Sequence, residues 1–256
     1  MKEVKRLLPK SHLMYLGDTA RVPYGIRSAE TVTRYAMESA LFLKNKGINM
    51  LVVACNTSTA VALDALSSGY EVPIIGVIEP GAKAAAAATR RGRVGVIGTS
   101  ATIDSGAYPE AIRQIDAGIS VVGLECPMFV PLIEEGWLEN EVARLTAKEY
   151  LYRLYHMDSD IDTVVLGCTH YPLLKQTIQK VAGGIFEQRV TLVDSAGETA
   201  KVVKEEVVDK KIPIDEGGRT DFFVTDFPER FSQVGSMFLG EKIESALRVE
   251  LPDCGA

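Results

Sequence analysis

Two cysteines in nearly identical surroundings are the residues of this sequence best suited to chemistry. Residues 50–58 read MLVVACNTS, and residues 163–172 read TVVLGCTHYP. In both stretches an apolar run of strand character is followed by a small residue, then by Cys55 or Cys168, and then by polar residues that lead into a predicted helix. The two cysteines lie too far apart in the sequence for a local turn to bring their thiols together. We expect the fold to bring them together from opposite walls of one cleft, as a paired acid and base.

The position of each cysteine, between a strand and a helix, predicts a reactive thiol. In an open α/β sheet, ligands bind at the carboxyl ends of the strands, where both cysteines fall. Backbone N–H groups and the positive end of the helix dipole then face the sulfur, which lowers the pKa of a thiol and favours the thiolate. The same N–H groups suit the carboxylate of a substrate.

Three other interpretations of these cysteines stay open. A free cysteine is often only a small buried apolar residue. Cys55, Cys168 and His170 could instead form a zinc site, and the two thiols could form a redox disulfide. The sequence has no CxxC motif and only three histidines, which argues against the last two interpretations. The matched surroundings of the two thiols favour acid/base chemistry.

His170 and Glu125 are the candidates to assist the cysteines. His170 follows Thr169 in the same loop as Cys168, so it either tunes that thiol or is a structural histidine. Glu125 ends another predicted strand and is either an acid/base helper or an ordinary loop charge. Further polar or small residues follow predicted strands at the same sheet end, and we expect them to face the same ligand: Tyr24, Gly25, Asn56, Thr57, Thr99, Ser100, Thr102, Asp194 and Ser195.

Short strands and helices alternate along the whole chain. The predicted strands cover residues 14–17, 50–54, 73–77, 93–98, 119–124, 163–167, 190–193 and 222–224, with a further one within 242–249. Helices are predicted from an N-cap at Ser28 to Gly47, and over residues 59–66, 81–89 and 140–156. The strands are rich in Val and Ile and apolar on both faces, which is typical of parallel strands covered by helices on both sides. We therefore predict a doubly wound α/β fold, and the repeated cysteine motif favours two domains.

Composition excludes several classes of function. The chain has 256 residues, 46% of them hydrophobic, and a net charge of −6, whereas a nucleic-acid partner requires a basic surface. No stretch approaches the ~20 apolar residues of a membrane span, and residues 1–10 lack the pattern of a signal peptide. Four cysteines are too few for a disulfide scaffold, so we expect free thiols and a reducing, cytoplasmic setting.

Several motifs together identify a family. They are GDTARVPYG at 17–25, VVACNTSTA at 52–60, GVIEPG at 76–81, VGVIGTSATI at 94–103, LGCTHYPLL at 166–174 and VDSA at 193–196. With these motifs spread over essentially its whole length, the chain resembles the glutamate racemases of the aspartate/glutamate racemase superfamily. The two cysteine loops indicate the superfamily, and the segment at 17–25 points to the glutamate branch.

The resemblance implies a fold, an activity and a set of site residues. It implies two α/β domains with the active site between them: residues 1–78 with 189–256, which carry Cys55, and residues 79–188, which carry Cys168. It also implies a homodimer and interconversion of L- and D-glutamate without a cofactor or metal, supplying D-glutamate for peptidoglycan. The implied catalytic residues are Cys55 and Cys168, assisted by His170 and Glu125, and the implied substrate contacts are Tyr24, Gly25, Asn56, Thr57, Thr99, Thr102, Thr169 and His170.

The chain departs from the family pattern at its beginning. Family members usually open with a strand and a glycine-rich turn resembling GVFDSGVGG, whereas this sequence opens with MKEV, inside what we expect to be the following helix. Val4, Leu7 and Leu8 form the apolar stripe of that helix, and we expect a slot in the sheet beside it. One alternative follows from this departure: a weakly active or non-catalytic form that binds a ligand or protein partner. Another member of the superfamily, a racemase of another acidic amino acid such as aspartate, is a second alternative.

Overall fold

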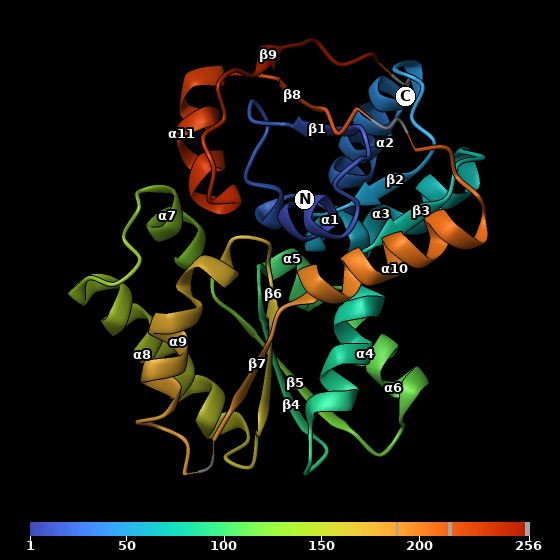
Figure 1. Cartoon of the computed structure of the whole chain (residues 1–256). Coiled ribbons are helices and arrows are strands. Elements are labelled where there is room, and N and C mark those ends of the chain that lie inside the picture. Colours follow the sequence, from blue (N-terminus) through green and yellow to red (C-terminus); the bar gives the residue numbers. More distant parts are fainter. Residues whose placement is uncertain (188, 215–216, 254–256) are drawn as a thin grey trace.

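In the part of the chain that the structure describes, every strand pair is parallel and the strands form three sheets (Figure 1). The computed structural model describes residues 1–187, 189–214 and 217–253. The strands are β1 (Leu13–Gly17), β2 (Leu51–Val53), β3 (Ile74–Gly76), β4 (Arg93–Gly98), β5 (Ser120–Glu125), β6 (Thr163–Gly167), β7 (Thr191–Val193), β8 (Thr220–Val224) and β9 (Leu247–Arg248). The sheet orders are β5-β4-β6-β7, β1-β8-β9 and β2-β3. The predicted α/β class with mainly parallel strands is confirmed.

Helices separate most of the strands in the sequence. They are α1 (Lys2–Leu7), α2 (Ala29–Asn45), α3 (Asn56–Gly69), α4 (Ile78–Ala88), α5 (Ser100–Asp104), α6 (Ala107–Ile115), α7 (Phe129–Glu134), α8 (Glu141–Met157), α9 (Lys175–Ala182), α10 (Ser195–Asp209) and α11 (Pro228–Leu239), with 3-10 turns η1 (Tyr24–Ile26) and η2 (Tyr171–Leu174). Ser28 and Asn140 cap α2 and α8, because their side chains accept hydrogen bonds from the N–H groups of Thr31 and Ala143. None of the helices in the described part of the chain combines the length and the apolar composition that crossing a membrane requires.

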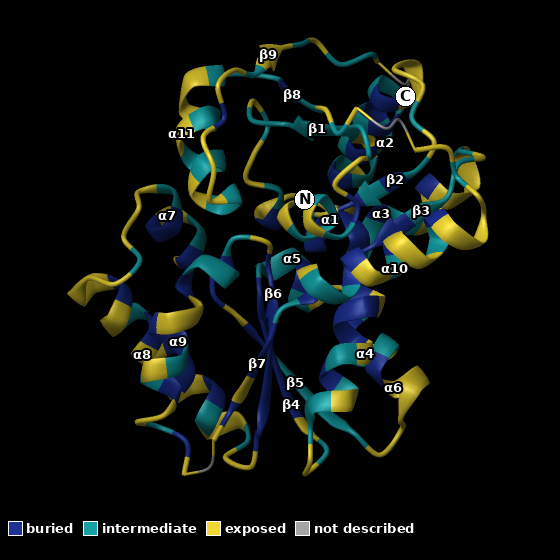
Figure 2. Cartoon of the chain, in the orientation of Figure 1, coloured by how far each residue is buried: buried dark blue, intermediate teal, exposed yellow. Residues whose placement is uncertain are grey.

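The four-stranded sheet is the core of the lower unit in Figure 1, which we define by strands β4–β7. Val94 and Val96 of β4 face a cluster formed with α4 and α6, while Ile97 faces a second cluster formed with α7, α8 and α9. Successive side chains of a strand point to opposite faces, so a strand covered on both sides must be apolar throughout. Figure 2 shows the strands of this sheet as mostly buried, as the sequence predicted.

The upper unit, defined by strands β1, β2, β3, β8 and β9, has its strands divided between two sheets. Leu16 of β1 and Val53 of β2 nevertheless share one apolar cluster with α2 and α3. On the other face of β2 and β3, α1 and α10 contribute Val4 and Val203. The sequence predicts a slot in this sheet, and among the described residues β1 and β2 are each paired along one edge only.

One strand is shorter than the sequence predicts. The terminal strand expected within residues 242–249 is reduced to β9, Leu247–Arg248. β7 is hydrogen-bonded to β6 of the lower unit. The chain therefore crosses between the units after β7, where α10 begins.

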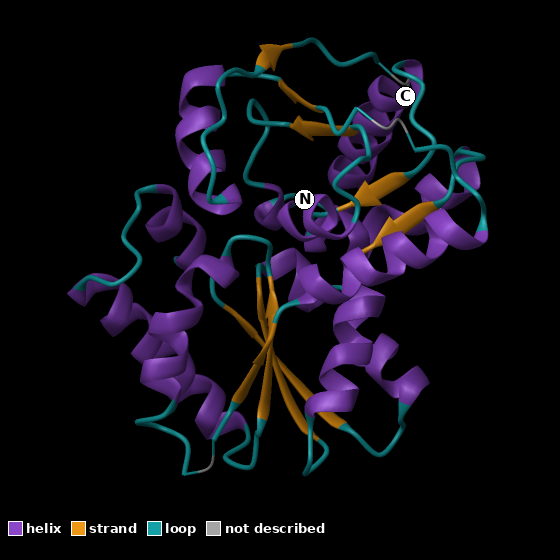
Figure 3. Ribbon diagram, in the orientation of Figure 1, coloured by secondary structure: helices purple, strands orange, loops and turns teal. Residues whose placement is uncertain are grey.

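The carboxyl ends of the lower strands point toward the upper unit. α5 and η2 follow β4 and β6 with only short connections, and α5 lies at the boundary between the two units in Figure 3. Ligands of open α/β sheets bind at this end of the strands. The candidate site is therefore expected where the two units meet.

Candidate functional site

The two predicted cysteines follow strands of different units. Cys55 follows β2 and is the N-cap residue of α3, while Cys168 directly follows β6. The charge of Cys55 contributes to raising the pKa of Cys168, so the two sulfurs lie within electrostatic reach of each other. Cys55 is half-buried and Cys168 is 7% exposed. The two thiols thus lie near each other in different solvent environments.

The surroundings of Cys168 keep its thiol protonated. Burial is the largest influence and raises the pKa of Cys168 to about 12, although hydrogen bonds from the N–H groups of His170 and Tyr171 act in the opposite direction. The predicted N–H groups are thus present, but the prediction of a lowered pKa is wrong for Cys168. The loop continues into a short 3-10 turn, and desolvation of the thiolate outweighs the pull of two N–H groups. Cys168 is therefore suited to the role of proton donor.

A histidine and a carboxylate extend from Cys168 in a row. The Nδ1 atom of His170 lies 3.9 Å from Cys168 Sγ, and its Nε2 atom lies 3.3 Å from Glu134 Oε1 at the end of α7. The hydrogen bond from His170 is the main cause that lowers the pKa of Glu134. The ring thus lies between the two side chains, with Nε2 donating to Glu134 and Nδ1 facing the sulfur. Sequence reasoning missed Glu134, since its contact with His170 depends on how α7 packs beside η2.

Glu125, the predicted helper carboxylate, occupies a different place. It ends β5, its side chain is exposed to solvent, and it accepts a hydrogen bond from the hydroxyl of Ser100. Its position at the carboxyl end of a strand agrees with the sequence analysis. The carboxylate that contacts His170, however, is Glu134.

Three predicted threonines form a cluster of hydroxyl groups between the units. Thr57 of α3 lies 3.0 Å from Thr99 and 3.2 Å from Thr102, and Thr99 lies 3.0 Å from Thr102, all between Oγ1 atoms. Thr57 and Thr102 are buried. Each hydroxyl is both donor and acceptor, so this cluster can reorganise to donate to a carboxylate.

Gly25 and Tyr24 approach the same cluster from the loop after β1. A Cβ atom at Gly25 would lie 2.5 Å from Thr99 Cβ, so only glycine permits this contact. The hydroxyl of Tyr24 donates to Asp18, whose carboxylate also accepts a hydrogen bond of 2.6 Å from Arg21 Nε. These bonds hold Gly25 and Tyr24 beside the hydroxyl cluster.

The remaining predicted contacts lie in the two cysteine loops. Asn56 is 3% exposed, and its Oδ1 atom accepts a hydrogen bond of 2.7 Å from the hydroxyl of Tyr108. Thr169 is exposed in the turn that follows Cys168. Tyr108 was not predicted, because it lies in α6, away from every strand end.

The other cysteines lie outside this arrangement. Cys126 is fully buried, and burial is the main cause that raises the pKa of its thiol far above the ordinary value. Cys254 lies outside the described residues. Cys55, Cys126 and Cys168 are free thiols, and within the ranges described no three His, Cys, Asp or Glu side chains gather closely enough to hold a metal ion.

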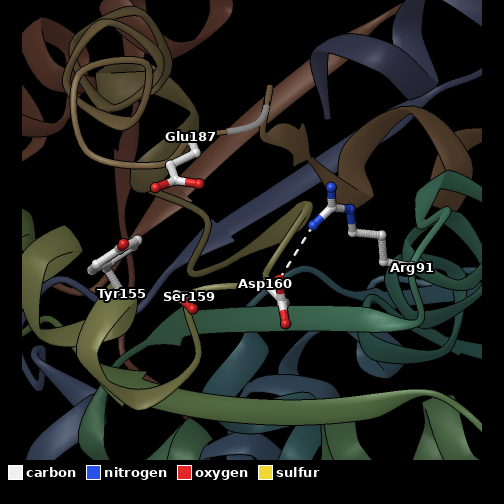
Figure 4. A pocket seen from close by; sticks show the side chains of 5 residues that line it. All are labelled: Arg91, Tyr155, Ser159, Asp160 and Glu187. Carbon is white, nitrogen blue, oxygen red and sulfur yellow. Dashed lines mark hydrogen bonds and ion pairs between the residues drawn. The ribbon is translucent and has the colours of Figure 1, made fainter.

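A separate polar hollow lies at the opposite end of the lower unit. It has a volume of about 310 Å³ and is lined by Arg91, Tyr155, Ser159, Asp160 and Glu187 (Figure 4). Arg91 and Asp160 form an ion pair of 3.2 Å just before β4 and β6 begin. The hollow is thus at the amino ends of the strands, whereas both cysteines are at the carboxyl ends.

Comparison with known proteins identifies the family. Residues 1–203 match the family described as Asp/Glu/Hydantoin racemase. A glutamate racemase of Geobacter metallireducens is 52% identical over 253 residues, which cover 98% of this chain and 92% of that protein. A glutamate racemase from Francisella tularensis, solved in complex with D-glutamate, is 34% identical with a TM-score of 0.88, covering 97% of this chain and 91% of that one. A glutamate racemase isoform from Bacillus anthracis is 39% identical with a TM-score of 0.89, covering 98% of this chain and 92% of its own. The chain belongs to the glutamate racemase family.

Proposed function

We propose that Cys55 and Cys168 are the acid and base with which this chain interconverts L- and D-glutamate. In one direction, a thiolate takes the α-proton, so that an S–H bond forms while the electron pair of the Cα–H bond stays on the substrate. The other thiol then gives its proton to the opposite face of Cα. The observation that carries the proposal is that two thiols from different units share one site.

The different environments of the two thiols support distinct starting roles. Cys168, whose pKa is raised by burial, starts as the acid, and the more exposed Cys55 at the N-terminus of α3 starts as the base. After one turnover the proton has moved, and the roles reverse for the other enantiomer. Proton transfer by a positioned side chain contributes about 10²–10⁴-fold to a rate. His170 and Glu134 orient and polarise the Cys168 side of this pair.

Donors around the thiols account for the rest of the expected rate enhancement. Removal of the α-proton places negative charge next to the substrate carboxylate, and preorganised N–H and O–H groups stabilise such charge. We propose that Asn56, Thr57, Thr99, Thr102 and Thr169 supply these donors, together with the backbone at Gly25. Tyr24 and His170 stay predicted substrate contacts, although their own protons are directed at Asp18 and Glu134. Glu125 stays a prediction as a helper, with its place at the end of β5 as its support.

Several further properties follow from the family. We propose a homodimer in the cytoplasm that needs neither pyridoxal phosphate nor a metal and supplies D-glutamate for peptidoglycan. The division into residues 1–78 with 189–256 and residues 79–188 stays a prediction.

The test is a polarimetric assay of the purified protein with L-glutamate and, separately, L-aspartate. We expect loss of optical rotation with glutamate and little or none with aspartate. A faster reaction with aspartate would favour the aspartate alternative. No reaction with either, together with calorimetric binding of glutamate, would favour a non-catalytic binding protein.

A further inference from the structure

Tyr108 is a fully buried tyrosine that contacts both cysteine loops. Its side chain is 1% exposed, and its hydroxyl donates to Asn56 Oδ1, the residue directly after Cys55, at 2.7 Å. A Cβ atom at Gly167, the residue directly before Cys168, would lie 3.3 Å from the ring of Tyr108, so Tyr108 also lies against the Cys168 loop. Burial is the main cause that raises the pKa of Tyr108. The hydroxyl therefore stays protonated and remains a hydrogen-bond donor throughout the neutral pH range.

The polarity of this contact determines which end of the Asn56 amide is occupied. An asparagine side chain has an accepting oxygen and a donating NH₂ group. Since Tyr108 has a single O–H proton and directs it at Oδ1, the oxygen end of Asn56 is engaged away from the substrate. The NH₂ end is then the one left for an acceptor. A substrate carboxylate only accepts hydrogen bonds. If the Asn56 amide were flipped, its accepting Oδ1 atom would face the carboxylate oxygens and no hydrogen bond could form.

Two neighbours support this orientation of the Tyr108 hydroxyl. Ser195, at the start of α10, hydrogen-bonds the phenol oxygen and lowers the pKa of Tyr108, which is the effect of a donor to that oxygen. Ser195 thus takes an accepting position of the hydroxyl, and Asn56 takes its proton. Gly81 of α4 leaves the space for this pair, because a Cβ atom there would lie 3.1 Å from the hydroxyl of Tyr108 and 3.1 Å from Ser195 Cβ.

We propose that Tyr108 is a positioning residue that fixes the amide of Asn56 with its NH₂ group toward the substrate carboxylate. Tyr108 itself does not touch the substrate: it acts through Asn56, in a row of hydrogen bonds that runs from Ser195 through Tyr108 to Asn56. This inference rests on the proposed function, since it takes Asn56 as a contact of the glutamate carboxylate. It adds a residue of α6 and one of α10 to the determinants of substrate binding.

The test compares Tyr108→Phe with Tyr150→Phe. Both variants remove one buried hydroxyl, but Tyr150 bonds the backbone N–H of Met128 in the lower unit and has no contact with Asn56. We expect Tyr108→Phe to raise KM for glutamate by about 3- to 10-fold, the effect of one lost hydrogen bond, with a smaller change in kcat. Tyr150→Phe should leave KM unchanged even where it lowers the melting temperature. Gly81→Ala, which crowds the hydroxyl, should raise KM in the same direction.

A double-mutant cycle and a spectroscopic signal separate positioning from general destabilisation. In an Asn56→Ala background, Tyr108→Phe should have no further effect on KM. Independently of activity, the side-chain amide resonances of Asn56, identified by their loss in Asn56→Ala, should shift in Tyr108→Phe and not in Tyr150→Phe. Additive effects on KM, or unchanged amide resonances, would overturn the inference. If the wild-type protein fails to racemise glutamate, the proposed function fails, while the amide resonances still decide whether Tyr108 orients Asn56.

Discussion

The pair of Glu134 and His170 offers a sharp test of how Cys168 is supported. Substituting Glu134→Gln keeps the size of the side chain and an oxygen that can accept from His170 Nε2, but removes the negative charge. The two groups lie 3.3 Å apart, with side chains 34% and 27% exposed. A hydrogen bond to a charged acceptor contributes about 1.5–3 kcal/mol, and one between neutral groups about 0.5–1.5 kcal/mol. Removing the charge while keeping the acceptor should therefore cost about 1–2 kcal/mol.

A loss of that size corresponds to a decrease in kcat/KM of about 5- to 30-fold. The two enantiomers of glutamate have equal free energies in water, so kcat/KM must fall equally in both directions. Glu134→Ala also removes the hydrogen-bond acceptor, and we expect a larger decrease. The negative charge of Glu134 helps to raise the pKa of Cys168, so in Glu134→Gln this thiol should be alkylated at lower pH than in the wild type.

The assay is initial-rate polarimetry from both enantiomers, with mass spectrometry of alkylated Cys168 as a second readout. Glu135→Gln is the matched control, because Glu135 is the next residue, has a side chain 65% exposed and pairs only loosely with Arg230 at 3.5 Å. It should stay within about twofold of the wild type, as expected for an exposed pair. Equal losses in the two variants, or no loss in Glu134→Gln, would refute the role given to Glu134.

Three further predictions concern stability, the close approach of the units, and cofactors. Burial of Asp162 alone would raise the pKa of its carboxyl group. Hydrogen bonds from the Thr89 hydroxyl and from the N–H groups of Arg90 and Arg91 outweigh this effect and lower that pKa. Asp162→Asn should therefore lower the free energy of unfolding by about 1–2 kcal/mol at neutral pH. Because the folded-state pKa is depressed, this stabilisation is present above the ordinary Asp pKa of about 3.9, and thermal melts of the two proteins should converge as the pH falls below it. Gly25→Ala places a Cβ atom 2.5 Å from Thr99 Cβ. It should lower the free energy of unfolding by about 1–3 kcal/mol and raise KM for glutamate. A melting temperature and KM equal to those of the wild type would contradict the close contact. Exhaustive dialysis against a chelator should leave the racemisation rate unchanged, and a large loss restored by zinc would contradict a mechanism based on thiols alone.

The parts of the structure that were predictable are those encoded by local patterns. Apolar runs rich in Val and Ile, bounded by turn residues, located the strands of the lower sheet and the loops of Cys55 and Cys168. The helix cap at Ser28 was also visible, because capping depends on residues three positions apart. The same local patterns did not locate the ends of the terminal strand, which was predicted within residues 242–249 and covers only Leu247–Arg248.

The parts that were missed depend on packing between distant elements. Glu134 and Tyr108 enter the site from α7 and α6, and nothing near them in the sequence marks them as neighbours of His170 and Asn56. The pKa of Cys168 was predicted in the wrong direction for the same reason. The N–H groups that lower it are a local feature, whereas the burial that raises it arises from tertiary packing. Likewise, the pairing of β7 with β6 could not be derived from the sequence of β7 alone.

The most direct test of the two-thiol site is the kinetics of Cys55→Ala and Cys168→Ala beside the wild type. Each variant should lose racemisation of both L- and D-glutamate by at least about 10²-fold, because each removes the proposed proton carrier on one face of the substrate. Both should keep a cooperative thermal melt and calorimetric binding of glutamate, since the proposed carboxylate contacts come from other groups. Racemisation near the wild-type rate by either single variant would contradict the account.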